Sequence, residues 1–541
     1  MARTSEAQVH PVDDVPRPTR LLAFGLQHVL AMYAGAVAVP LIVGGALGLG
    51  PAELAYLITA DLLICGIATL IQCVGWWRFG ARLPIMQGCT FAAVTPMVLI
   101  GQDGGLPAIY GSVIVCGIAI MLLAPVFGRL LRFFPPLVTG TVILIIGLSL
   151  LPVAGNWAAG GAGADDFGDP RHLALAGGVL LVILLVQRFG PGLLGRVAVL
   201  AGIAAGTAVS VPLGLTDFSG VADADWLGVS TPFHFGAPEF QLAAILSMLV
   251  VGLVCMTETT GDLIAVGELT GRRPDARRLA DGLRADGFST VLGGVFNTFP
   301  YTAYAQNVGL VALTRVRSRW VVAAAGALLV LLGLLPKLGA VVAAVPAPVL
   351  GGAGLVMFGS VAASGLRTLA TVDFGGGAGA HRLTVVAVSV AVGLLPVGVP
   401  GIYERFPHGA QTLLDSGISA GCVTAIALNL LFHHLPRRSA VSPDAVPDAP
   451  DVPEAVPDGG APVRGTADVR EAARAADTAD VPAHDGPGRS PGAGAGTSRE
   501  ARGGPGAPDG GPPAPDVPEA ADAPPPPPAD GTREPRDAAA P

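Results

Sequence analysis

Residues Thr298-Phe-Pro-Tyr-Thr-Ala-Tyr-Ala-Gln-Asn-Val-Gly-Leu-Val-Ala-Leu-Thr314 hold a short apolar stretch that Pro300 interrupts near its start and Gly309 in its middle. Alone it is too short to cross a membrane, because about 20 apolar residues are needed to span the hydrocarbon core. A second such stretch, 84–100, is broken at Leu83-Pro84 and at Gly88. Short, interrupted segments of this kind are typical of membrane transporters, where the broken backbone lines a cavity near the midplane.

Longer apolar stretches surround these two. We expect fourteen membrane spans near residues 21–44, 51–75, 84–100, 107–127, 135–153, 172–188, 193–214, 241–267, 279–299, 304–314, 320–336, 338–362, 382–398 and 411–433. Loops that lead from an even-numbered to an odd-numbered span hold sixteen arginines, and the opposite loops hold only three basic residues. Because basic loops stay in the cytoplasm, this asymmetry predicts one consistent orientation with both termini cytoplasmic.

The two halves of the chain repeat one another. At an offset of 219 residues, Gln87, Ala93 and Thr95 match Gln306, Ala312 and Thr314. At an offset of 212 residues, Pro136, Gly140 and Gly147 match Pro348, Gly352 and Gly359. These matches relate span 3 to span 10 and span 5 to span 12, always seven apart. An odd separation inverts one half relative to the other, which is common in secondary transporters.

Composition divides the chain into three parts. The whole chain is 51% hydrophobic and 13% charged, whereas soluble domains are about 25% charged. We expect a cytoplasmic segment at 1–20, a transporter domain at 21–435 and a tail at 436–541. The body holds 22 acidic and 22 basic residues, so the net charge of −8 lies in the tail. The tail is rich in Pro, Ala, Gly and Asp and is expected to be disordered and cytoplasmic.

The composition also excludes some classes of protein. A neutral body leaves no basic surface for nucleic acid, and six cysteines in apolar segments without paired spacing exclude a disulfide scaffold. The first twenty residues lack the apolar core of a signal peptide. The sequence carries no HExxH or Walker pattern, so it predicts neither a metalloprotease-type enzyme nor an ATP-driven pump.

Few ionisable side chains lie at membrane depth. They are His28, Glu258, Asp262 and Asp286, with Asp61 a weaker fifth. Each would cost about 2.5–3.5 kcal/mol to insert as a charge, so each needs a partner or a watery cavity. Glu258 and Asp262 are four residues apart and share one helix face. A carboxyl in apolar surroundings can take up a proton near neutral pH and so couple a proton to a solute.

Each of these groups also has a simpler interpretation. Glu258 and Asp262 could be neutral acids hydrogen-bonded to a neighbouring helix, and His28 could be a packed core histidine. Asp286 could form an ion pair with a nearby arginine such as Arg284, and the two breaks could be ordinary helix kinks.

Two adjacent amides, Gln306 and Asn307, lie in an apolar region beside these groups. A carboxamide both donates and accepts a hydrogen bond, which suits the edge of a purinedione or a uracil. A glutamate opposite it can accept from ring N–H groups. Phe91, just past the break in span 3, could cover the face of the ring or simply be packed.

Several motifs resemble the nucleobase–ascorbate transporter family, the second type of nucleobase–cation symporters. They are Gln27-His28, Glu258-Thr-Thr-Gly-Asp262, Ala285-Asp286-Gly287 and Gln306-Asn-Val-Gly-Leu-Val-Ala-Leu-Thr314. The run Phe296–Asn307, followed by Val316-Arg-Ser-Arg319, resembles bacterial uric acid and xanthine permeases more than uracil permeases. The resemblance covers about residues 20–435, and the tail has no counterpart in it.

The resemblance implies an all-α integral membrane fold of seven plus seven inverted repeats. A core domain of spans 1–4 and 8–11 would carry the substrate past a gate domain of spans 5–7 and 12–14 in an elevator-like movement, usually within a homodimer. The implied substrate-binding residues are Glu258, Gln306, Thr90, Phe91 and Ala305. The implied residues for proton coupling and support of the site are Glu258, Asp286, Asp262, His28 and Asn307. Arg315 departs from the family, whose urate-type members often have Gly there.

We therefore expect a proton-coupled importer of uric acid, xanthine or both, in the cell membrane, with no cofactor and no metal. Uracil members of the family tend to carry glutamate where Gln306 stands, which favours an oxidised purine as the substrate here. A uracil or pyrimidine symporter of the same fold is the alternative. An inorganic-anion exchanger or channel of the same fold would favour a basic group in spans 3, 8 or 10. Those spans hold none apart from Arg315 at an end.

Overall fold

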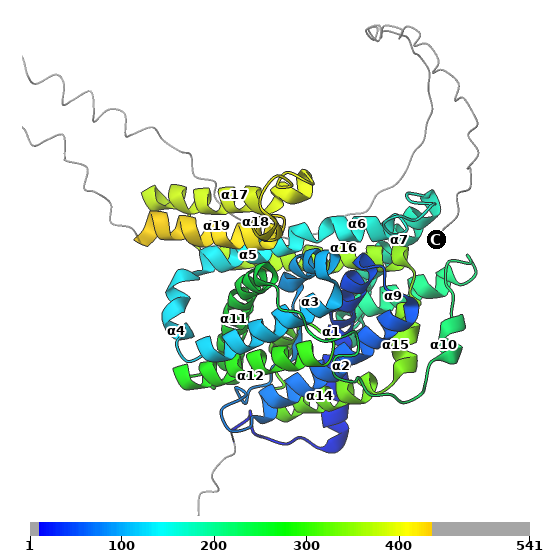
Figure 1. Ribbon diagram of the computed structural model, residues 1–541. Coiled ribbons are helices and arrows are strands. Elements are labelled where there is room, and N and C mark those ends of the chain that lie inside the picture. Colours follow the sequence, from blue (N-terminus) through cyan, green and yellow to red (C-terminus); the bar gives the residue numbers. More distant parts are fainter. Residues whose placement is uncertain (1–9, 435–541) are drawn as a thin grey trace, which may run out of the picture. The chain divides into compact units, whose positions relative to one another are not determined.

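The computed structural model describes residues 10–434, which form helices around one short two-stranded sheet (Figure 1). The predictions made for residues 1–9 and for the tail at 436–541 lie outside the described residues.

The long helices are α1 (Pro18–Ala46), α2 (Pro51–Val74), α3 (Val94–Leu123), α5 (Pro136–Ser149), α7 (Pro170–Phe189), α9 (Ala198–Ser210), α11 (Leu242–Thr270), α12 (Ala276–Val295), α14 (Arg319–Gly333), α16 (Ala347–Leu369), α17 (Gly376–Gly398) and α19 (Gly417–Asn429). The short helices are α4 (Phe127–Leu130), α6 (Leu151–Ala158), α8 (Leu193–Arg196), α10 (Ser219–Asp223), α13 (Ala305–Thr314), α15 (Pro336–Ala343) and α18 (His408–Leu414). The strands are β1 (Gln87–Cys89) and β2 (Tyr301–Ala303), and single turns lie at η1 (Phe91–Ala93), η2 (Leu131–Phe133) and η3 (Leu430–His434).

Within residues 10–434, eight helices are long and apolar enough to cross a membrane. A ninth candidate is the pair α14 and α15, which is bent by 82° at its break, and α9 and the stretch Gly417–His433 are shorter apolar helices. This confirms a mostly helical, multi-pass membrane protein. The count of fourteen spans stays a prediction, because broken, short or polar helices such as α12 and α13 do not meet the criterion of length and composition.

Two predicted boundaries differ from the structure. The expected span 3, 84–100, starts with β1 and η1, and α3 begins only at Val94. The break in α3 at Gly105, where φ is 67°, lies between the expected spans 3 and 4, at 84–100 and 107–127. Glycine adopts this left-handed conformation without a steric penalty, and Pro107 just after it has no N–H to donate. The expected span 12, at 338–362, contains the break between α15 and α16, and Pro346 lies in this break as the N-cap of α16.

The helices pack in two sets. The first set consists of α1, α2, α3, α11, α12, α13 and α14 and surrounds the sheet, and the second consists of α5, α6, α7, α9, α16, α17 and α19. In Figure 1, α17 and α19 lie side by side over α5. Glycines allow the closest approaches in the first set: a Cβ added to Gly66 of α2 would lie 2.5 Å from the carbonyl oxygen of Gly326 in α14. Such small-residue contacts are how membrane helices pack at short range.

The segment before α1 is bound to the first set of helices. Val12 is fully buried in a cluster with Leu263 and Val266 of α11. Asp13 forms ion pairs with Arg272, at 2.6 Å, and with Arg319, at 2.8 Å. The Arg319 backbone N–H also donates to the Val12 carbonyl oxygen at 2.9 Å. Nothing in the sequence pattern of residues 1–20 predicted this attachment.

Asp13 is held in its charged form. Partial burial alone would raise the pKa of its carboxyl, but the hydrogen bonds and positive charges of Arg272 and Arg319 outweigh burial, so the pKa lies below the ordinary value of 3.8. A carboxyl with a lowered pKa contributes stability that is fully present above its ordinary pKa and is lost as the pH falls through the lowered value.

We predict that Asp13→Asn lowers the stability of the folded protein by about 1 kcal/mol, because two ion pairs to Asp13 are lost. The measurement is the apparent unfolding temperature of purified protein in detergent at pH 7. Asp14→Asn is the matched control, since the Asp14 side chain is exposed and forms no ion pair with a described residue. Equal unfolding temperatures for the two variants would contradict the prediction.

Candidate functional site

The two broken segments meet inside the first set of helices. β1 and β2 pair antiparallel, with Gln87 opposite Ala303, Gly88 opposite Thr302 and Cys89 opposite Tyr301. All six residues of the two strands are buried. Extended backbone at this depth needs hydrogen-bond partners, and each strand supplies them to the other. The alternative of ordinary helix kinks is therefore wrong.

A helix begins directly after each strand. Thr90 follows β1, and its hydroxyl accepts a hydrogen bond from the Ala92 backbone N–H at 3.1 Å, which caps the turn η1. α13 begins at Ala305 after β2, and no side chain caps it. The uncapped N–H groups and the positive end of the helix dipole make the start of α13 suitable for an electron-rich ligand.

Glu258 lies on α11, which contacts both η1 and α13. Its side chain is partly exposed although its neighbours Thr257 and Thr259 are buried. Glu258 and Asp262 make no hydrogen bond or ion pair with another described residue. A neutral acid bonded to a neighbouring helix, the simpler interpretation for both, is not what the structure shows.

Gln306 and Ala305 are exposed at the start of α13, whereas Asn307 beside them is buried. The Asn307 side-chain amide lies 3.0 Å from His28 Nδ1 and donates to the His28 carbonyl oxygen, also at 3.0 Å. His28 is on α1 and is 2% exposed. The predicted pair of supporting residues is thus brought together, and it fixes α13 to α1 while leaving Gln306 open.

Asp286, on α12, is buried and forms no ion pair with an arginine. Arg284 instead pairs with Asp281. One carboxylate oxygen of Asp286 accepts from the Gln72 side-chain amide at 3.0 Å. The sequence analysis did not find Gln72, because a single amide within an apolar span carries no distinctive pattern.

Thr90 and Phe91 are both buried, with 2% and 9% of their surface exposed. The Phe91 ring packs edge-on against Phe358 of α16, with ring centroids 5.8 Å apart. In this conformation Phe91 is thus a packing contact between the two sets of helices.

Tyr304, between β2 and α13, is a site residue that the sequence analysis missed. A Cβ added to Gly35 of α1 would lie 2.0 Å from the Tyr304 hydroxyl, and one added to Gly88 would lie 2.7 Å from the Tyr304 ring. The hydroxyl itself is buried without a hydrogen-bond partner. Two glycines therefore make room for this ring at the crossing of the strands.

Arg315 ends α13 in the left-handed conformation, with φ of 56° and ψ of 19°. Glycine is the residue most favoured at such a helix end, and another residue there costs conformational energy. This explains why glycine suits the position. Arg315, which differs from the residue common in urate-type members of the family, thus lies at the end of α13 and away from its start.

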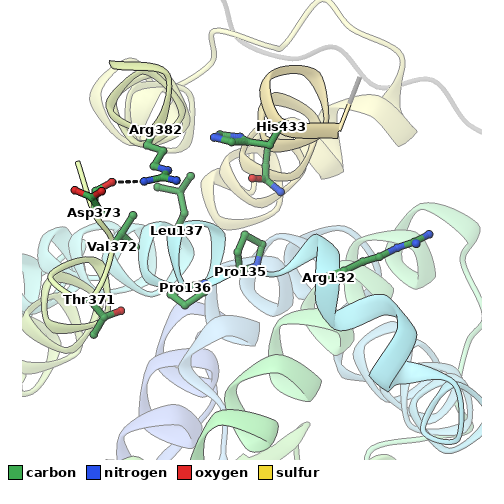
Figure 2. A pocket seen from close by; sticks show the side chains of 10 residues that line it. Arg132, Pro135, Pro136, Leu137, Thr371, Val372, Asp373, Arg382 and His433 are labelled. Atoms are coloured by element: carbon green, nitrogen blue, oxygen red, sulfur yellow. Dashed lines mark hydrogen bonds between the residues drawn. The ribbon is translucent and has the colours of Figure 1, made fainter. Parts of the chain in front are cut away.

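A surface hollow of about 400 Å³ lies elsewhere, at the ends of α5, α16, α17 and α19 (Figure 2). Arg132 and Arg382 line it, and Arg382 donates to the Asp373 carbonyl oxygen. None of the predicted site residues lines this hollow, so it is separate from the candidate site.

Comparison with known proteins places the chain among transporters. Residues 19–402 match a family model described as a permease family. The chain is 45% identical to the uric acid transporter UacT of Escherichia coli, over 82% of this chain and 93% of that protein. It is 46% identical to the uric acid permease PucK of Bacillus subtilis, over 78% and 97%. It is 45% identical to the xanthine permease of B. subtilis, over 79% and 97%.

Solved structures show the same fold at low identity. The structure of SLC26A9 matches with a TM-score of 0.51 and 12% identity, covering 77% of this chain and 66% of that one. The murine Slc26a9 anion transporter in its inward-facing state matches with a TM-score of 0.50 and 14% identity, covering 80% and 73%. At such identities the likeness concerns the fold alone.

We predict that Gly35→Ala destabilises the protein by about 1–3 kcal/mol, because the new methyl group overlaps the Tyr304 hydroxyl. Tyr304→Phe should be close to wild type, since it removes a buried hydroxyl that has no partner. The double variant Gly35→Ala/Tyr304→Phe should recover part of the loss. Apparent unfolding temperatures of the purified variants measure all three effects, and a double variant no more stable than Gly35→Ala would contradict the proposed contact.

Proposed function

This chain belongs to the permease family of the nucleobase–ascorbate transporters, and on that premise we propose that it imports oxidised purine nucleobases, uric acid or xanthine, together with a proton. It is a membrane transporter of this family and not an enzyme. Relatives about 45% identical over most of their length carry the names of uric acid and xanthine permeases.

The observation that carries the proposal is that Glu258 is partly exposed between two buried threonines and that Gln306 is exposed beside the buried Asn307. Their helices, α11 and α13, contact each other. A carboxylate accepts hydrogen bonds from ring N–H groups, and a carboxamide both donates to ring carbonyl oxygens and accepts from N–H groups. Uric acid and xanthine present alternating N–H and C=O groups along their edges, which these two side chains can satisfy together.

Glu258 is also the proposed proton carrier. A charged carboxylate at membrane depth is costly unless it has a partner or reaches water. Glu258 has no hydrogen-bond or ion-pair partner among residues 10–434, so a proton or a substrate N–H would lower this cost. The other buried groups near it are engaged: His28 with Asn307, and Asp286 with Gln72.

The conformation described here is proposed to be open toward the cytoplasm. From Glu258 onward, α11 is exposed or partly exposed at Gly261, Asp262, Ala265 and Glu268, and α13 is exposed at Ala305, Gln306, Gly309 and Leu313. Each residue of a set lies three or four positions from another residue of that set, which places the set on one face of its helix. Both helices end in loops rich in arginine, which are cytoplasmic by the positive-inside rule.

Helix packing supports an elevator-like movement between a core and a gate. The first set of helices, with the turn η1 that leads into α3, contains every predicted site residue, and the second set contains none, as expected for a carrier that moves past a scaffold. The contacts also exchange under a repeat of seven spans: α2 packs on α14 and α12 on α3, while α7 packs on α9 and α17 on α19. In the predicted numbering, α2 and α14 are spans 2 and 11, and α12 and the second part of α3 are spans 9 and 4. Replacing each span by its counterpart seven spans away therefore turns the first contacting pair into the second.

The remaining parts of the proposal follow from the family. A homodimer in the cell membrane is what the resemblance to the family implies, and the asymmetry of the arginines predicts both termini in the cytoplasm. Uracil is the alternative substrate, and no structural observation favours it over a purine.

Uptake in cells that lack their own purine transporters tests the function. Labelled uric acid should enter cells that express the protein, excess xanthine should block its entry, and excess uracil should not. A proton uncoupler should abolish accumulation. Uptake of uracil alone would overturn the proposed substrate class, and accumulation that resists the uncoupler would overturn proton coupling.

We predict that Glu258→Gln lowers proton-driven uptake at least 100-fold with normal expression, because the amide cannot carry the proton. Glu268→Gln, on the same helix, is the control: Glu268 is exposed and pairs with Arg273, so uptake should stay within about twofold of wild type. Gradient-driven uptake that survives in Glu258→Gln would rule out the coupling role.

We predict that Gln306→Glu weakens uric acid uptake about tenfold or shifts preference toward uracil, because a hydrogen-bond donor becomes an acceptor. Competition by uric acid, xanthine and uracil against one labelled substrate measures the shift. An unchanged competition profile would mean that Gln306 does not contact the base.

A further inference from the structure

One face of α2 is polar and completely buried. Asp61, Cys65, Thr69 and Gln72 lie four, four and three residues apart, which places them in one row along the helix. All four are 0% exposed. A membrane helix that buries an acid, a hydroxyl and an amide in one row needs specific partners for them, and here the partners belong to the candidate site.

Asp61 receives hydrogen bonds from both strands of the crossing. Its Oδ1 accepts from the Tyr301 hydroxyl of β2 at 2.8 Å and from the Cys89 thiol of β1 at 2.6 Å. It also accepts from the Thr298 hydroxyl, just before β2, at 2.9 Å. Within α2 the Cys65 thiol donates to Oδ2 at 3.5 Å.

The other two polar groups of the row hold further parts of the site. The Thr69 hydroxyl accepts from the Gln87 backbone N–H of β1 at 3.0 Å. The Gln72 side-chain amide donates to Asp286 at 3.0 Å, and its oxygen accepts from the Ala81 backbone N–H at 2.8 Å. One helix face therefore contacts β1, β2 and the carboxylate of α12.

We propose that Asp61 is a positioning residue for the substrate site: its carboxylate fixes β1 and β2 against α2, and thereby places Thr90–Phe91 and Ala305–Gln306 relative to each other. The proposal deepens the function proposed above and rests on it. Asp61 does not contact the substrate in this scheme. It acts through the two strands, each of which leads directly into a helix start at the site.

A carboxylate is needed there because three donors from two separate segments converge on one oxygen. Hydrogen bonds to a charged acceptor are about twice as strong as those between neutral groups. An asparagine with its oxygen at the Oδ1 place would offer the three donors only a neutral acceptor, and its N–H groups would face the Cys65 thiol, which also donates. The crossing would then loosen, and a site loosened by as little as 1 Å can lose much of its effectiveness.

The test compares Asp61→Asn with a matched pair at one of its donors. Cys89→Ser keeps a donor and should behave like wild type, whereas Cys89→Ala removes it. We expect Asp61→Asn to raise the KM for uric acid about tenfold or more, and Cys89→Ala to raise it less. Maximal velocity per transporter, measured with quantified surface expression, should change less than threefold. The order of competitors should stay the same, because Asp61→Asn leaves the hydrogen-bonding groups of Glu258 and Gln306 chemically unchanged.

A double variant separates positioning from plain stability. Thr298→Val removes a second donor to Asp61, and Asp61→Asn/Thr298→Val should have a KM no higher than Asp61→Asn alone, because both act through one contact. Ser112→Ala is the control for a lost buried hydrogen bond away from the crossing, since Ser112 donates to Ile109 within α3. It should lower the unfolding temperature slightly and leave KM unchanged.

The outcomes distinguish this inference from the proposed function. If the wild-type protein carries no purine, the proposed function fails before any variant is compared. If wild type carries uric acid and Asp61→Asn reaches the membrane with an unchanged KM, the positioning role is overturned. A variant that fails to reach the membrane is replaced by the Cys89→Ser and Cys89→Ala pair, whose equal KM values would overturn it as well.

Discussion

The arrangement of this protein depends on one constraint: backbone N–H and C=O groups inside a membrane must find partners within the protein. Two segments of the chain give up helical structure at membrane depth and pair with each other as β1 and β2. Because the partner of each strand lies more than 200 residues away in sequence, the crossing forces the two halves of the chain together. The helix packing around the crossing, the glycines at close contacts and the polar face of α2 all serve to keep it in place.

The same constraint explains where the functional side chains lie. A strand that ends in the interior leaves the following helix to begin in the interior, so α13 starts beside α11 and not at the membrane surface. The N-terminus of α13 and the adjoining Gln306 can therefore contact a ligand in the interior. The backbone of β2 stays hydrogen-bonded, because it pairs with β1. The second set of helices has no such break in the described part of its repeats at α7, α9, α17 and α19, and it also carries none of the candidate residues. This division is what the proposed movement of a core past a scaffold requires.

Much of the fold and site could be predicted from the sequence, because the relevant signals are periodic or costly. Apolar stretches, arginine-rich loops and prolines within spans predicted a multi-pass helical protein with breaks at Leu83-Pro84 and Gly88 and at Thr298–Pro300 and Gly309. The structure has strands at Gln87–Cys89 and Tyr301–Ala303, but the break predicted at Gly309 is wrong, because Gly309 lies within α13. Rare intramembrane charges such as Glu258 and Asp286 were also conspicuous. Their partners were not: Gln72, Cys89 and Tyr304 are ordinary in an apolar span until a distant segment lies against them. Attachment of Val12 and Asp13 was equally hidden, since one valine and one acid in a polar segment form no pattern.

The contrast between the buried acids argues for their different roles. Asp61 accepts from three side chains on one oxygen, and Asp286 is bonded to Gln72, so a change of charge at either would disturb hydrogen bonds that hold the crossing or α12 in place. Glu258 has no such bonds and is partly exposed, so it can gain or lose a proton without breaking the scaffold. A coupling group must change its charge in every transport cycle, whereas a positioning group must not. On this physical ground the free carboxylate of α11 is suited to coupling, and the fully bonded carboxylate of α2 is suited to holding the site in shape.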